Sequence, residues 1–357
     1  KFIAAFMEDT GQLGIKPATQ NPRVINYMDE IIAFVSTLVD KGFAYVSEGD
    51  VYFRVAKSNN YAKLANKTLE DLEIGASGRT DAETERKENP LDFALWKAAK
   101  EGEVSWDSPW GPGRPGWHIE CSVMATEILG DTIDIHGGGA DLEFPHHTNE
   151  IAQSEAKTGK TFANYWMHNG FVNVDNEKMS KSLGNFVTVH DMLQTVDGQV
   201  LRFFLATQQY RKPINFTEKA IHDAEVNLKY LKNTHSLPLT EQVNQAELQT
   251  YLDAFQEAMD DDFNTANGVT VLFDMAKWIN SGNYDQTVKD AFEKMLQVFG
   301  IVFEEEVLDE DIEKLIEERQ AARANKDFAT ADRIRDELAA QGIKLLDTKE
   351  GVRWTRD

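Results

Sequence analysis

The sequence predicts a mixed α/β fold that continues into an all-helical region and ends in a small α+β module. Between Gly116 and Phe216, helical and strand patterns alternate and glycines follow a strand, which favours a parallel sheet covered by helices. Beyond Phe216, strand patterns nearly vanish. After residue 311, two helical patterns precede a short hairpin. We therefore expect a partial Rossmann-type parallel sheet, then a helical bundle, then the α+β module.

The first part of the chain predicts one helix and two strands. Asn21 and Pro22 favour a helix start, because Asn caps a first turn and Pro fits its first position. Apolar residues at helical spacing continue to Val39, and Gly42 ends the pattern. The elements expected up to residue 117 are a helix over 22–39, strands over 43–46 and 51–55, a surface loop over 78–90 and irregular backbone over 106–117.

Regular patterns continue through the rest of the chain. The elements expected in the α/β region are helices over 119–129 and 148–157 and strands over 132–136 and 171–174. The elements expected after it are helices over 218–233, 248–259, 267–279 and 287–300, an acidic linker over 304–311, helices over 312–324 and 329–341, and a hairpin over 343–354. The linker marks the tail as a separate module.

Composition excludes several classes of protein. Hydrophobic residues make up 41% and charged residues 27% of the chain, which is wrong for disorder, and no apolar run approaches the roughly 18 residues that span a bilayer. The charge sum of 37 − 60 = −23 argues against nonspecific capture of nucleic acid. Residues 312–357 carry equal numbers of acidic and basic side chains, so they are the better candidate to bind a polyanion. A single cysteine excludes an internal disulfide and fits a reducing cytoplasm.

Cys121, His146 and Glu150 form a candidate metal site. His146 and Glu150 are four residues apart at an expected helix start, so both side chains project from one face. A thiolate, an imidazole and a carboxylate are all ligands of zinc. The alternative is that Cys121 is a small buried apolar residue and that His146 caps the helix. No fourth protein ligand is evident, although two more histidines and an aspartate lie nearby in the sequence.

Two further segments could bind a nucleotide. The glycines at 137–139 follow an expected buried strand, where a backbone without side chains lets a base and ribose approach, although a plain turn has the same composition. The run Lys-Met-Ser-Lys-Ser at 178–182 lies on a polar loop after a strand, and its two lysines could neutralise a triphosphate. Most runs of lysine and serine are only solvated loops.

Several ordered motifs together point to a known family. The run at 178–182 resembles the second signature of class I aminoacyl-tRNA synthetases, and residues 113–122, 136–141 and 144–150 together resemble the cysteinyl-tRNA synthetases. This resemblance covers essentially the whole chain. It implies ATP-dependent ligation of L-cysteine to tRNA(Cys) through a cysteinyl adenylate, with release of pyrophosphate. It also implies a cytoplasmic enzyme that is a monomer when complete and does not associate with membranes.

The resemblance implies a domain division and a missing segment. The division is residues 1–22, a remnant of the first Rossmann half; 23–110, a connective insertion; 111–216, the second half of the catalytic domain with the 178–182 loop; 217–303, a helical bundle that orients the tRNA; 304–311, the acidic linker; and 312–357, an anticodon-binding module. In the family a second zinc cysteine and a His-x-Gly-His signature come before these segments, and neither occurs in the 357 residues. We therefore expect a chain cut inside its first Rossmann half and inactive by itself.

The resemblance also implies roles for individual residues. In the family two cysteines, a histidine and a glutamate hold one zinc ion (Zn²⁺), and Cys121, His146 and Glu150 match three of these ligands. Lys178 and Lys181 would stabilise the pyrophosphate that leaves ATP, the substrate bound with Mg²⁺. The resemblance assigns ATP binding to His136, Gly137, Gly138, Asp141 and Lys181. It assigns cysteine binding to Trp117, Cys121 and His136.

Recognition of the two specific substrates follows from the same resemblance. Cysteine and serine differ by sulfur for oxygen, which a pocket separates poorly by shape; zinc binds a thiolate directly, whereas a serine hydroxyl stays protonated and binds weakly. Arg323, Asp332 and Asp347 match positions that face anticodon bases in the family. Arginine can pair with the acceptors of guanine, and a carboxylate can accept from an exocyclic amine.

Two other functions and two structural expectations remain open at this point. A paralogue that couples cysteine to an amino sugar would need no anticodon module, and a non-catalytic tRNA-binding protein would have no reason to keep the zinc and lysine motifs together. We expect the 178–182 loop to be exposed and more mobile than the strand before it. Unless a neighbouring molecule pairs with the sheet, we also expect disorder near residues 1–20 or loosened packing around Ile133, Ile135 and Val172.

Overall fold

A computed structural model describes residues 1–59, 61–66, 86–180, 182–241, 243–303, 310–348 and 351–356. The chain divides into two compact units, Lys1–Ile301 and Val302–Asp357, and each is described by itself. Most of the surface loop expected over 78–90 lies outside the described residues. Within them, no helix is both long enough and apolar enough to cross a membrane.

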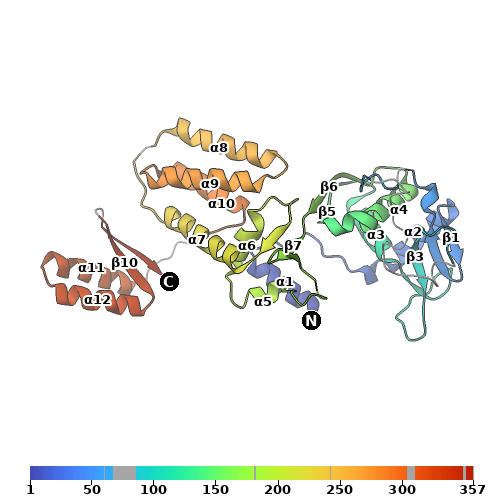
Figure 1. Ribbon diagram of the computed structural model, residues 1–357, viewed down its shortest axis with the longest axis horizontal. Coiled ribbons are helices and arrows are strands. Elements are labelled where there is room, and N and C mark those ends of the chain that lie inside the picture. Colours follow the sequence, from blue (N-terminus) through green and yellow to red (C-terminus); the bar gives the residue numbers. More distant parts are fainter. Residues whose placement is uncertain are drawn as a thin grey trace. The chain divides into compact units, whose positions relative to one another are not determined.

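The first part of unit 1 is an antiparallel sheet that shares its core with a helix that precedes it in sequence (Figure 1). The strands are β1 Ala44–Ser47, β2 Asp50–Phe53, β3 Phe93–Ala98 and β4 Gly113–Pro115, in the order β1-β2-β3-β4, and the helix is α2 Met28–Asp40. Ile31 and Phe34 of α2 share a fully buried core with Phe53 of β2 and Trp96 of β3. The two expected strands are confirmed, and the sheet adds β3 and β4.

Helix α2 begins later than the Asn-Pro pair indicated, so the predicted start at residue 22 is wrong. A single 3₁₀ turn, Val24–Asn26, comes first, and α2 starts at Met28. The buried side chains of α2 recur at helical spacing only from Met28 onward, whereas Ile25 is 61% exposed. The helix therefore starts where its apolar face meets the sheet, because packing contributes more to a helix than a local start signal does.

The irregular backbone expected over 106–117 is confirmed over 107–112, but a short strand and the start of a helix follow it. Gly113–Pro115 pairs with β3 as strand β4, and a helix starts directly after it at Trp117. Glycine makes this close approach possible, because a Cβ atom on Gly116 would lie 2.0 Å from the carbonyl oxygen of Ala94. The glycine- and proline-rich composition therefore marks an edge strand at this place and not a loop.

Two parallel strands and two helices form the part of unit 1 that carries the candidate metal site. Their bounds are α3 Trp117–Leu129, β5 Ile133–Gly139, α4 Thr148–Thr158 and β6 Ala163–Asn169, and a π-type turn, Glu143–His147, leads into α4. Strands β5 and β6 are parallel, with His136 opposite Trp166. Both expected helices are confirmed, each to within two residues at its ends, while β6 was not predicted.

The glycines at 137–139 belong to strand β5, so the strand does not end at residue 136 as expected, and the alternative of a plain glycine turn is wrong. They extend β5 and pair with the end of β6. A Cβ atom on Gly138 would lie 2.8 Å from Cε1 of His147, and one on Gly139 would lie 2.5 Å from Oδ1 of Asp141. Gly138 leaves room for the buried His147 ring, whereas the exposed Asp141 side chain near Gly139 could move aside.

A third sheet of unit 1 carries the lysine-containing loop. Its strands are β7 Val172–Val174, β8 Glu177–Lys178 and β9 Ile214–Phe216, in the order β8-β7-β9, and the helices α5 Val189–Met192 and α6 Gly198–Ala206 lie between β8 and β9 in sequence. The β7–β9 pair is parallel, and β7 pairs antiparallel with β8. Asp175 and Asn176 have φ angles of 48° and 67°, which suits the tight turn between these strands. The expected strand over 171–174 is confirmed.

Apolar side chains are exposed on α1 (Phe2–Gln12) and on β5. Helix α1 has no buried residue, and Phe2 is 82% exposed. On β5, Ile135 is 56% exposed while Ile133 is buried. The expected disorder near residues 1–20 is wrong for α1, and Ile133 remains packed.

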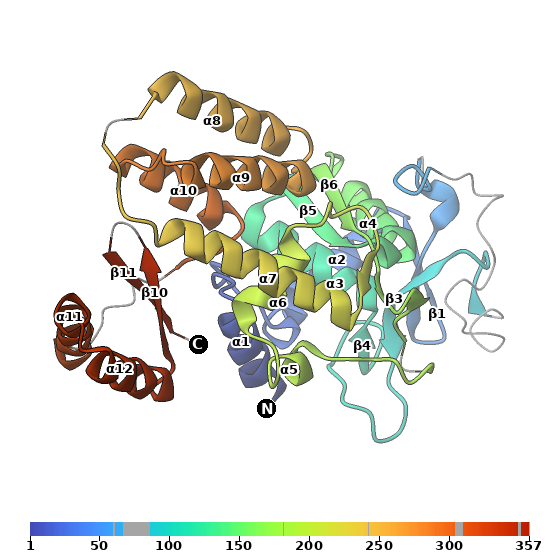
Figure 2. The same cartoon turned by 60° about the vertical axis from the view of Figure 1, so that its left-hand side comes forward.

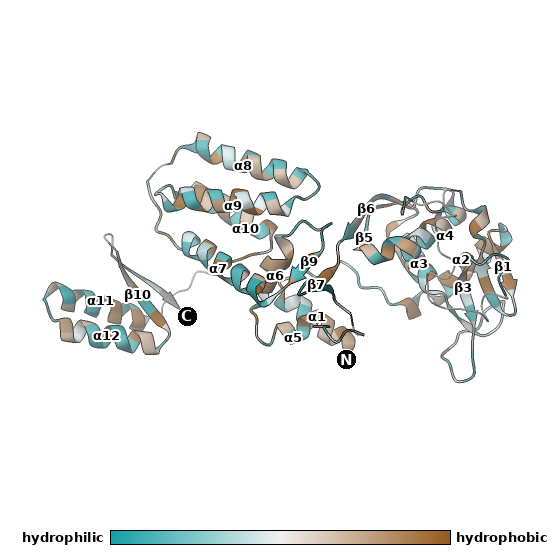
Figure 3. Ribbon diagram, viewed as in Figure 1, coloured by the Kyte–Doolittle hydropathy of each residue, from teal (hydrophilic) through white to brown (hydrophobic). Residues whose placement is uncertain are grey.

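Four helices follow β9 and confirm the all-helical region. They are α7 Glu218–His235, α8 Gln245–Asp260, α9 Thr265–Asn280 and α10 Gln286–Val298. Each begins at a side-chain cap that accepts a backbone N–H, supplied in order by Thr217, Asn244, Asn264 and Asp285. Hydrophobic and hydrophilic residues are interspersed along these helices (Figure 3), as expected for helices with one packed face.

Unit 2 consists of a helix pair and a β-hairpin (Figure 2). The elements are α11 Glu310–Ala324, α12 Phe328–Ala340, β10 Ile343–Thr348 and β11 Gly351–Arg356. Ile312 and Ile316 of α11 pack with Ile334 and Leu338 of α12 and with Ile343 of β10. The expected order of two helices and a hairpin is confirmed. Of the expected linker, residues 304–309 lie outside the described residues, and its last two residues begin α11.

Candidate functional site

Three predicted metal ligands converge between α3 and α4. Cys121 lies on α3, His146 lies in the turn before α4, and Glu150 lies in the first turn of α4. Their ligand atoms all lie within 4.8 Å of one another, and Nε2 of His146 is 2.9 Å from Oε1 of Glu150. His146 and Glu150 are buried, and Cys121 is half-buried. The geometry thus brings the three predicted ligands together.

The burial and hydrogen bonding of Glu150 indicate whether a cation fits between Cys121, His146 and Glu150. Glu150 is fully buried, and neither of its oxygens has a hydrogen bond of acceptable geometry, although His146 and His136 approach them at 2.9 and 3.3 Å. A buried carboxylate without such partners costs several kcal/mol unless it binds a cation. Sulfur, nitrogen and carboxylate oxygen together form a donor set typical of zinc, so the residues fit a zinc ion.

The ionisation of the two acidic ligands reflects their surroundings. Burial opposes the charge of Glu150, but its contacts with His136 and His146 outweigh burial and hold the pKa of its carboxyl below the ordinary value. Burial, with help from Glu150 and Glu120, raises the pKa of the Cys121 thiol to about 12. Cys121 is therefore a neutral thiol in the metal-free protein at pH 7, and a bound cation would be needed to hold it as a thiolate.

A cluster of histidines surrounds these ligands, and three of its members (His118, His147 and His168) have no role predicted from the sequence. Nδ1 of His118 lies 2.9 Å from Nδ1 of His146, and Nδ1 of His147 lies 2.8 Å from Nε2 of His168. Burial lowers the pKa of His118 and of His147 to about 4, so both rings are neutral at pH 7. The one local signal was the position of His118, three residues before Cys121 on the same helix.

His136 lies between the metal ligands and strand β6. Its Nε2 atom is 3.3 Å from Oε2 of Glu150, and its ring lies 4.7 Å from those of His147 and Trp166. Ligand atoms of His136, His147 and Glu150 also lie within 4.8 Å of one another, so Glu150 belongs to two possible donor sets. Unlike the first set, this second set lacks a thiol.

Trp117 lies beside the metal ligands with most of its ring exposed. The side chain is 59% exposed, and its ring centroid is 4.2 Å from that of His146. Because Trp117 is one helical turn before Cys121, both residues project from the same side of α3. An exposed indole at this place can form one wall of a pocket for a small apolar or sulfur-containing group.

The predicted ATP-binding residues lie in two separate segments. Gly137 and Gly138 lie near the end of β5, and Asp141 is exposed in the turn that follows. Lys178 is exposed at the end of β8, with Nζ 4.6 Å from the centre of the Phe171 ring. The predicted role of Lys181 falls on a residue outside those described. The expected exposure of the loop is confirmed for Lys178, and its greater mobility stays a prediction.

The loop that follows Lys178 is shaped by hydrogen bonds to Asn185. The Asn185 amide accepts from the backbone N–H of Ser180 at 2.9 Å and donates to the carbonyl oxygen of Lys178 at 3.3 Å. The hydroxyl groups of Ser180 and Ser182 lie 3.2 Å apart. These contacts hold the segment as a turn whose serines and Lys178 can reach a polyphosphate.

The predicted anticodon residues all lie in unit 2. Arg323 is exposed in the last turn of α11. Asp332 lies on α12, where Oδ1 is 2.9 Å from Nη1 of Arg335. Asp347 lies on β10, opposite Val352 of β11. The ion pair of Asp332 is within one helix and exposed, so a base could displace it at small cost.

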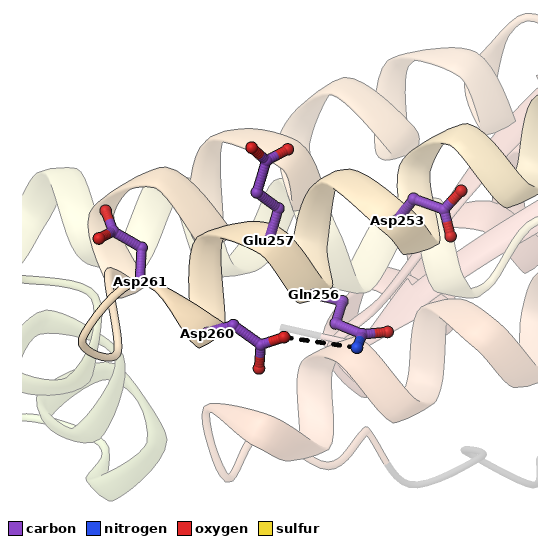
Figure 4. A pocket seen from close by; sticks show the side chains of 5 residues that line it. All are labelled: Asp253, Gln256, Glu257, Asp260 and Asp261. Carbon is purple, nitrogen blue, oxygen red and sulfur yellow. Dashed lines mark hydrogen bonds between the residues drawn. The ribbon is translucent and has the colours of Figure 1, made fainter.

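A shallow hollow on α8 is lined by four acidic side chains and one glutamine. Figure 4 shows Asp253, Gln256, Glu257, Asp260 and Asp261 projecting from the end of this helix. Gln256 donates to Asp260 at 3.4 Å. The acidic side chains point in different directions in Figure 4, so they do not converge on one ligand. We therefore place the candidate site at the cysteine and histidines and not here.

Models of known protein families match three segments of the chain. The model of the class I (C) tRNA synthetase catalytic domain matches residues 1–226. A DALR domain matches residues 254–304, and the cysteinyl-tRNA ligase anticodon binding domain matches residues 305–354. The catalytic model spans the candidate metal site and the 178–182 loop, and the anticodon model spans nearly all of unit 2.

Curated relatives are similar along the whole chain. The cysteine–tRNA ligase of Streptococcus thermophilus (strain CNRZ 1066) is 95% identical over 100% of this chain and 80% of the relative. The cysteine–tRNA ligase of Streptococcus agalactiae serotype III (strain NEM316) is 81% identical over the same shares. That of Streptococcus pyogenes serotype M6 (strain ATCC BAA-946 / MGAS10394) is 82% identical, again with 80% of the relative covered.

Solved structures with a similar fold are far more distant in sequence. The Mycobacterium tuberculosis methionyl-tRNA synthetase in complex with methionyl-adenylate has a TM-score of 0.55 at 15% identity and covers 83% of this chain and 74% of its own. A putative arginyl-tRNA synthetase from Campylobacter jejuni has a TM-score of 0.56 at 14% identity, with 85% and 68% covered. These likenesses concern the fold alone, which is that of the class I synthetases.

Proposed function

This chain belongs to the cysteinyl-tRNA synthetase (cysteine–tRNA ligase) family of class I aminoacyl-tRNA synthetases. On that premise we propose that Cys121, His146 and Glu150 bind one zinc ion that recognises the thiol of L-cysteine. The observation that carries the proposal is the convergence of a thiol and an imidazole on a buried carboxylate that lacks a hydrogen bond. Zinc would supply a Lewis acid that keeps a cysteine thiol deprotonated at neutral pH.

The residues around the ligands would select cysteine over serine. The exposed ring of Trp117 beside His146 would form a wall of the thiol pocket and exclude water from it. His136 would line the same pocket near the polar atoms of the amino acid. Because a serine hydroxyl stays protonated and binds zinc weakly, the metal ligands supply a discrimination that pocket shape cannot.

We propose that the same chain binds ATP and Mg²⁺ and supports formation of a cysteinyl adenylate. A carboxylate oxygen of cysteine attacks the α-phosphorus of ATP, and the bond to the β-phosphate breaks to release pyrophosphate. No general base is needed, because the attacking carboxylate is already ionised. Lys178 and Lys181 would neutralise charge on the leaving pyrophosphate, and Gly137, Gly138 and Asp141 would contact the adenosine.

Unit 2 would bind the anticodon of tRNA(Cys). The match of residues 305–354 to an anticodon binding domain supports this role and argues against the paralogue that couples cysteine to an amino sugar. Arg323, Asp332 and Asp347 would contact bases, through guanine acceptors and exocyclic amines respectively. We further propose a cytoplasmic location and a monomeric enzyme.

The number of zinc ligands and of phosphate-binding motifs in these 357 residues limits the activity that we propose for them. They contain one cysteine and no His-x-Gly-His sequence. We propose that they bind zinc through three protein ligands and a solvent or substrate ligand. We also propose that they catalyse cysteine-dependent ATP–pyrophosphate exchange slowly or not at all, because part of the family's triphosphate clamp is absent from this sequence.

Zinc binding by single-residue variants tests the proposal. We expect about one zinc per wild-type chain after dialysis, and a loss of affinity greater than about 100-fold in Cys121→Ser and His146→Ala, measured by competition with a chromophoric chelator. His222→Ala is the matched control, because His222 is an exposed histidine on α7. Equal zinc affinity in the wild type and Cys121→Ser would contradict the proposed site.

A further inference from the structure

We infer that His118 is a positioning residue that holds His146 in the tautomer able to bind zinc through Nε2. The inference rests on the proposed zinc site and adds to it a residue that is not itself a ligand. His118 is on the first turn of α3, and its Nδ1 atom lies 2.9 Å from Nδ1 of His146. Among the hydrogen bonds of the described residues, this is the one that reaches Nδ1 of His146.

The proton between the two rings can be assigned from the metal site. Nε2 of His146 points toward Glu150, at 2.9 Å from Oε1, so Nε2 is the nitrogen available to a metal there. A neutral imidazole that binds a metal through Nε2 carries its proton on Nδ1. Two ring nitrogens 2.9 Å apart share one proton, so Nδ1 of His146 donates and Nδ1 of His118 accepts.

The other tautomer of His146 would obstruct the metal. A proton on Nε2 would point into the gap between His146 and Glu150, where the ligand atoms of the proposed site converge. It would occupy the lone pair that binds the ion and attract the carboxylate that should also bind it. An acceptor on the Nδ1 side favours the productive tautomer, which is how residues behind a metal ligand commonly raise affinity.

Contacts at the start of α3 keep the His118 ring in place. Nε2 of Gln153, on α4, donates to the carbonyl oxygen of His118 at 2.6 Å and to the hydroxyl of Ser122 at 2.7 Å. The His118 ring also meets the ring of Phe93 edge-on, with centroids 5.8 Å apart. His118 is thus fixed by the same two helices that carry the metal ligands, so its acceptor stays aligned with His146.

Two substitutions separate an acceptor role from a packing role. His118→Phe keeps a ring against Phe93 but removes the acceptor, whereas His118→Asn loses the ring but keeps an oxygen close to the position of Nδ1. We expect His118→Phe to weaken zinc affinity by about 10- to 100-fold and His118→Asn to restore most of it. Chelator competition on the full 357-residue chain measures both, with His222→Phe as the surface control.

Nitrogen NMR of the zinc-loaded protein reports the tautomer directly. We expect the wild type to show a proton on Nδ1 of His146, protected from solvent exchange, and His118→Phe to lose that protection. Loss of zinc in His118→Asn as large as in His118→Phe would overturn the inference, as would unchanged affinity in both. If the wild type binds zinc and Cys121→Ser does not, either of these His118 results rejects the role of His118 but leaves the proposed zinc site standing. If the wild type binds no zinc, the proposed site and this inference fail together.

Discussion

Gly138 lies at the point where the histidine cluster contacts the parallel sheet. A Cβ atom there would lie 2.8 Å from Cε1 of His147 and 3.0 Å from Cδ1 of Leu142. A Cβ atom on its neighbour Gly137 would meet nothing nearer than the carbonyl oxygen of Met167 at 3.6 Å, which is ordinary contact. A side chain at position 138 would therefore clash with its neighbours, whereas one at position 137 would have room, although the two residues are adjacent in one strand.

Alanine at each position tests this difference. We expect Gly138→Ala to lower the free energy of unfolding by about 1–3 kcal/mol, because the buried His147 ring would have to move. Gly137→Ala should change it by less than about 1 kcal/mol. Urea unfolding of both variants measures the two effects. Equal urea midpoints for Gly138→Ala and Gly137→Ala would show that the His147 ring does not lie this close to β5.

The candidate site divides into residues that the sequence could predict and residues that it could not. His146 and Glu150 could be found, because a spacing of four at a helix start puts both on one face whatever else the chain does. His168 could not, because its contact with His147 depends on the pairing of β6 with β5, and β6 was not predicted. His118 was missed for a similar reason, since its partner is on another element.

At the scale of elements, helix α1 is held to α5 by a polar contact. Nδ1 of His190 on α5 lies 2.9 Å from Oδ1 of Asp9 on α1, and α1 itself buries no side chain. The hydrogen bond and charge of Asp9 raise the pKa of His190 above its ordinary value of 6.5. Protonated His190 is thus favoured by the fold, and its contribution is full below pH 6.5 and is lost as the pH rises through the raised pKa.

An NMR titration of His190 checks this contact. We expect the midpoint for His190 to lie above 6.5 in the wild type and to fall toward 6.5 in Asp9→Asn. Asp131→Asn is the control, because Asp131 pairs with Lys160 elsewhere in unit 1. An unchanged midpoint in Asp9→Asn would mean that α1 does not contact α5 through this pair.

Helices after β9 were predictable as elements, whereas the strands near the metal site were less so. Each helix of the bundle begins at a polar cap and has an apolar face of its own, which are both local properties. Strand β4 and the end of β5 are rich in glycine, and their strand state comes from a neighbour that pairs with them. Short strands of this kind are decided by tertiary contacts and not by propensity.

At the scale of the whole molecule, charge is divided unevenly along the chain. The net charge is −23, yet residues 312–357 are balanced, so this segment is the part of the chain that a polyanion approaches with less repulsion. Sequence order was sufficient to predict an α/β region followed by helices and an α+β module. The antiparallel sheet of β1 to β4 was only partly predictable, because two of its strands lie in a segment rich in aromatic residues, glycine and proline.

A substitution in unit 2 tests the proposed anticodon role. We expect Arg323→Ala to weaken binding of tRNA(Cys) by about 1–3 kcal/mol and to reduce discrimination against a changed anticodon. Arg333→Ala is the control, because Arg333 is likewise an exposed arginine on a helix of unit 2 and is not among the residues proposed to contact bases. Filter binding at fixed salt compares them. Equal losses with matched and changed anticodons would count against base contact by Arg323.

X-ray absorption at the zinc edge tests the central claim most directly. Cys121 is the single cysteine of the chain, so the protein can contribute one sulfur ligand. We predict one sulfur at about 2.3 Å from zinc in the protein without substrate, two after addition of L-cysteine, and one after addition of L-serine. A sulfur count that does not rise with L-cysteine, or zinc without any sulfur ligand, would contradict the claim that these residues hold the ion that recognises the substrate thiol.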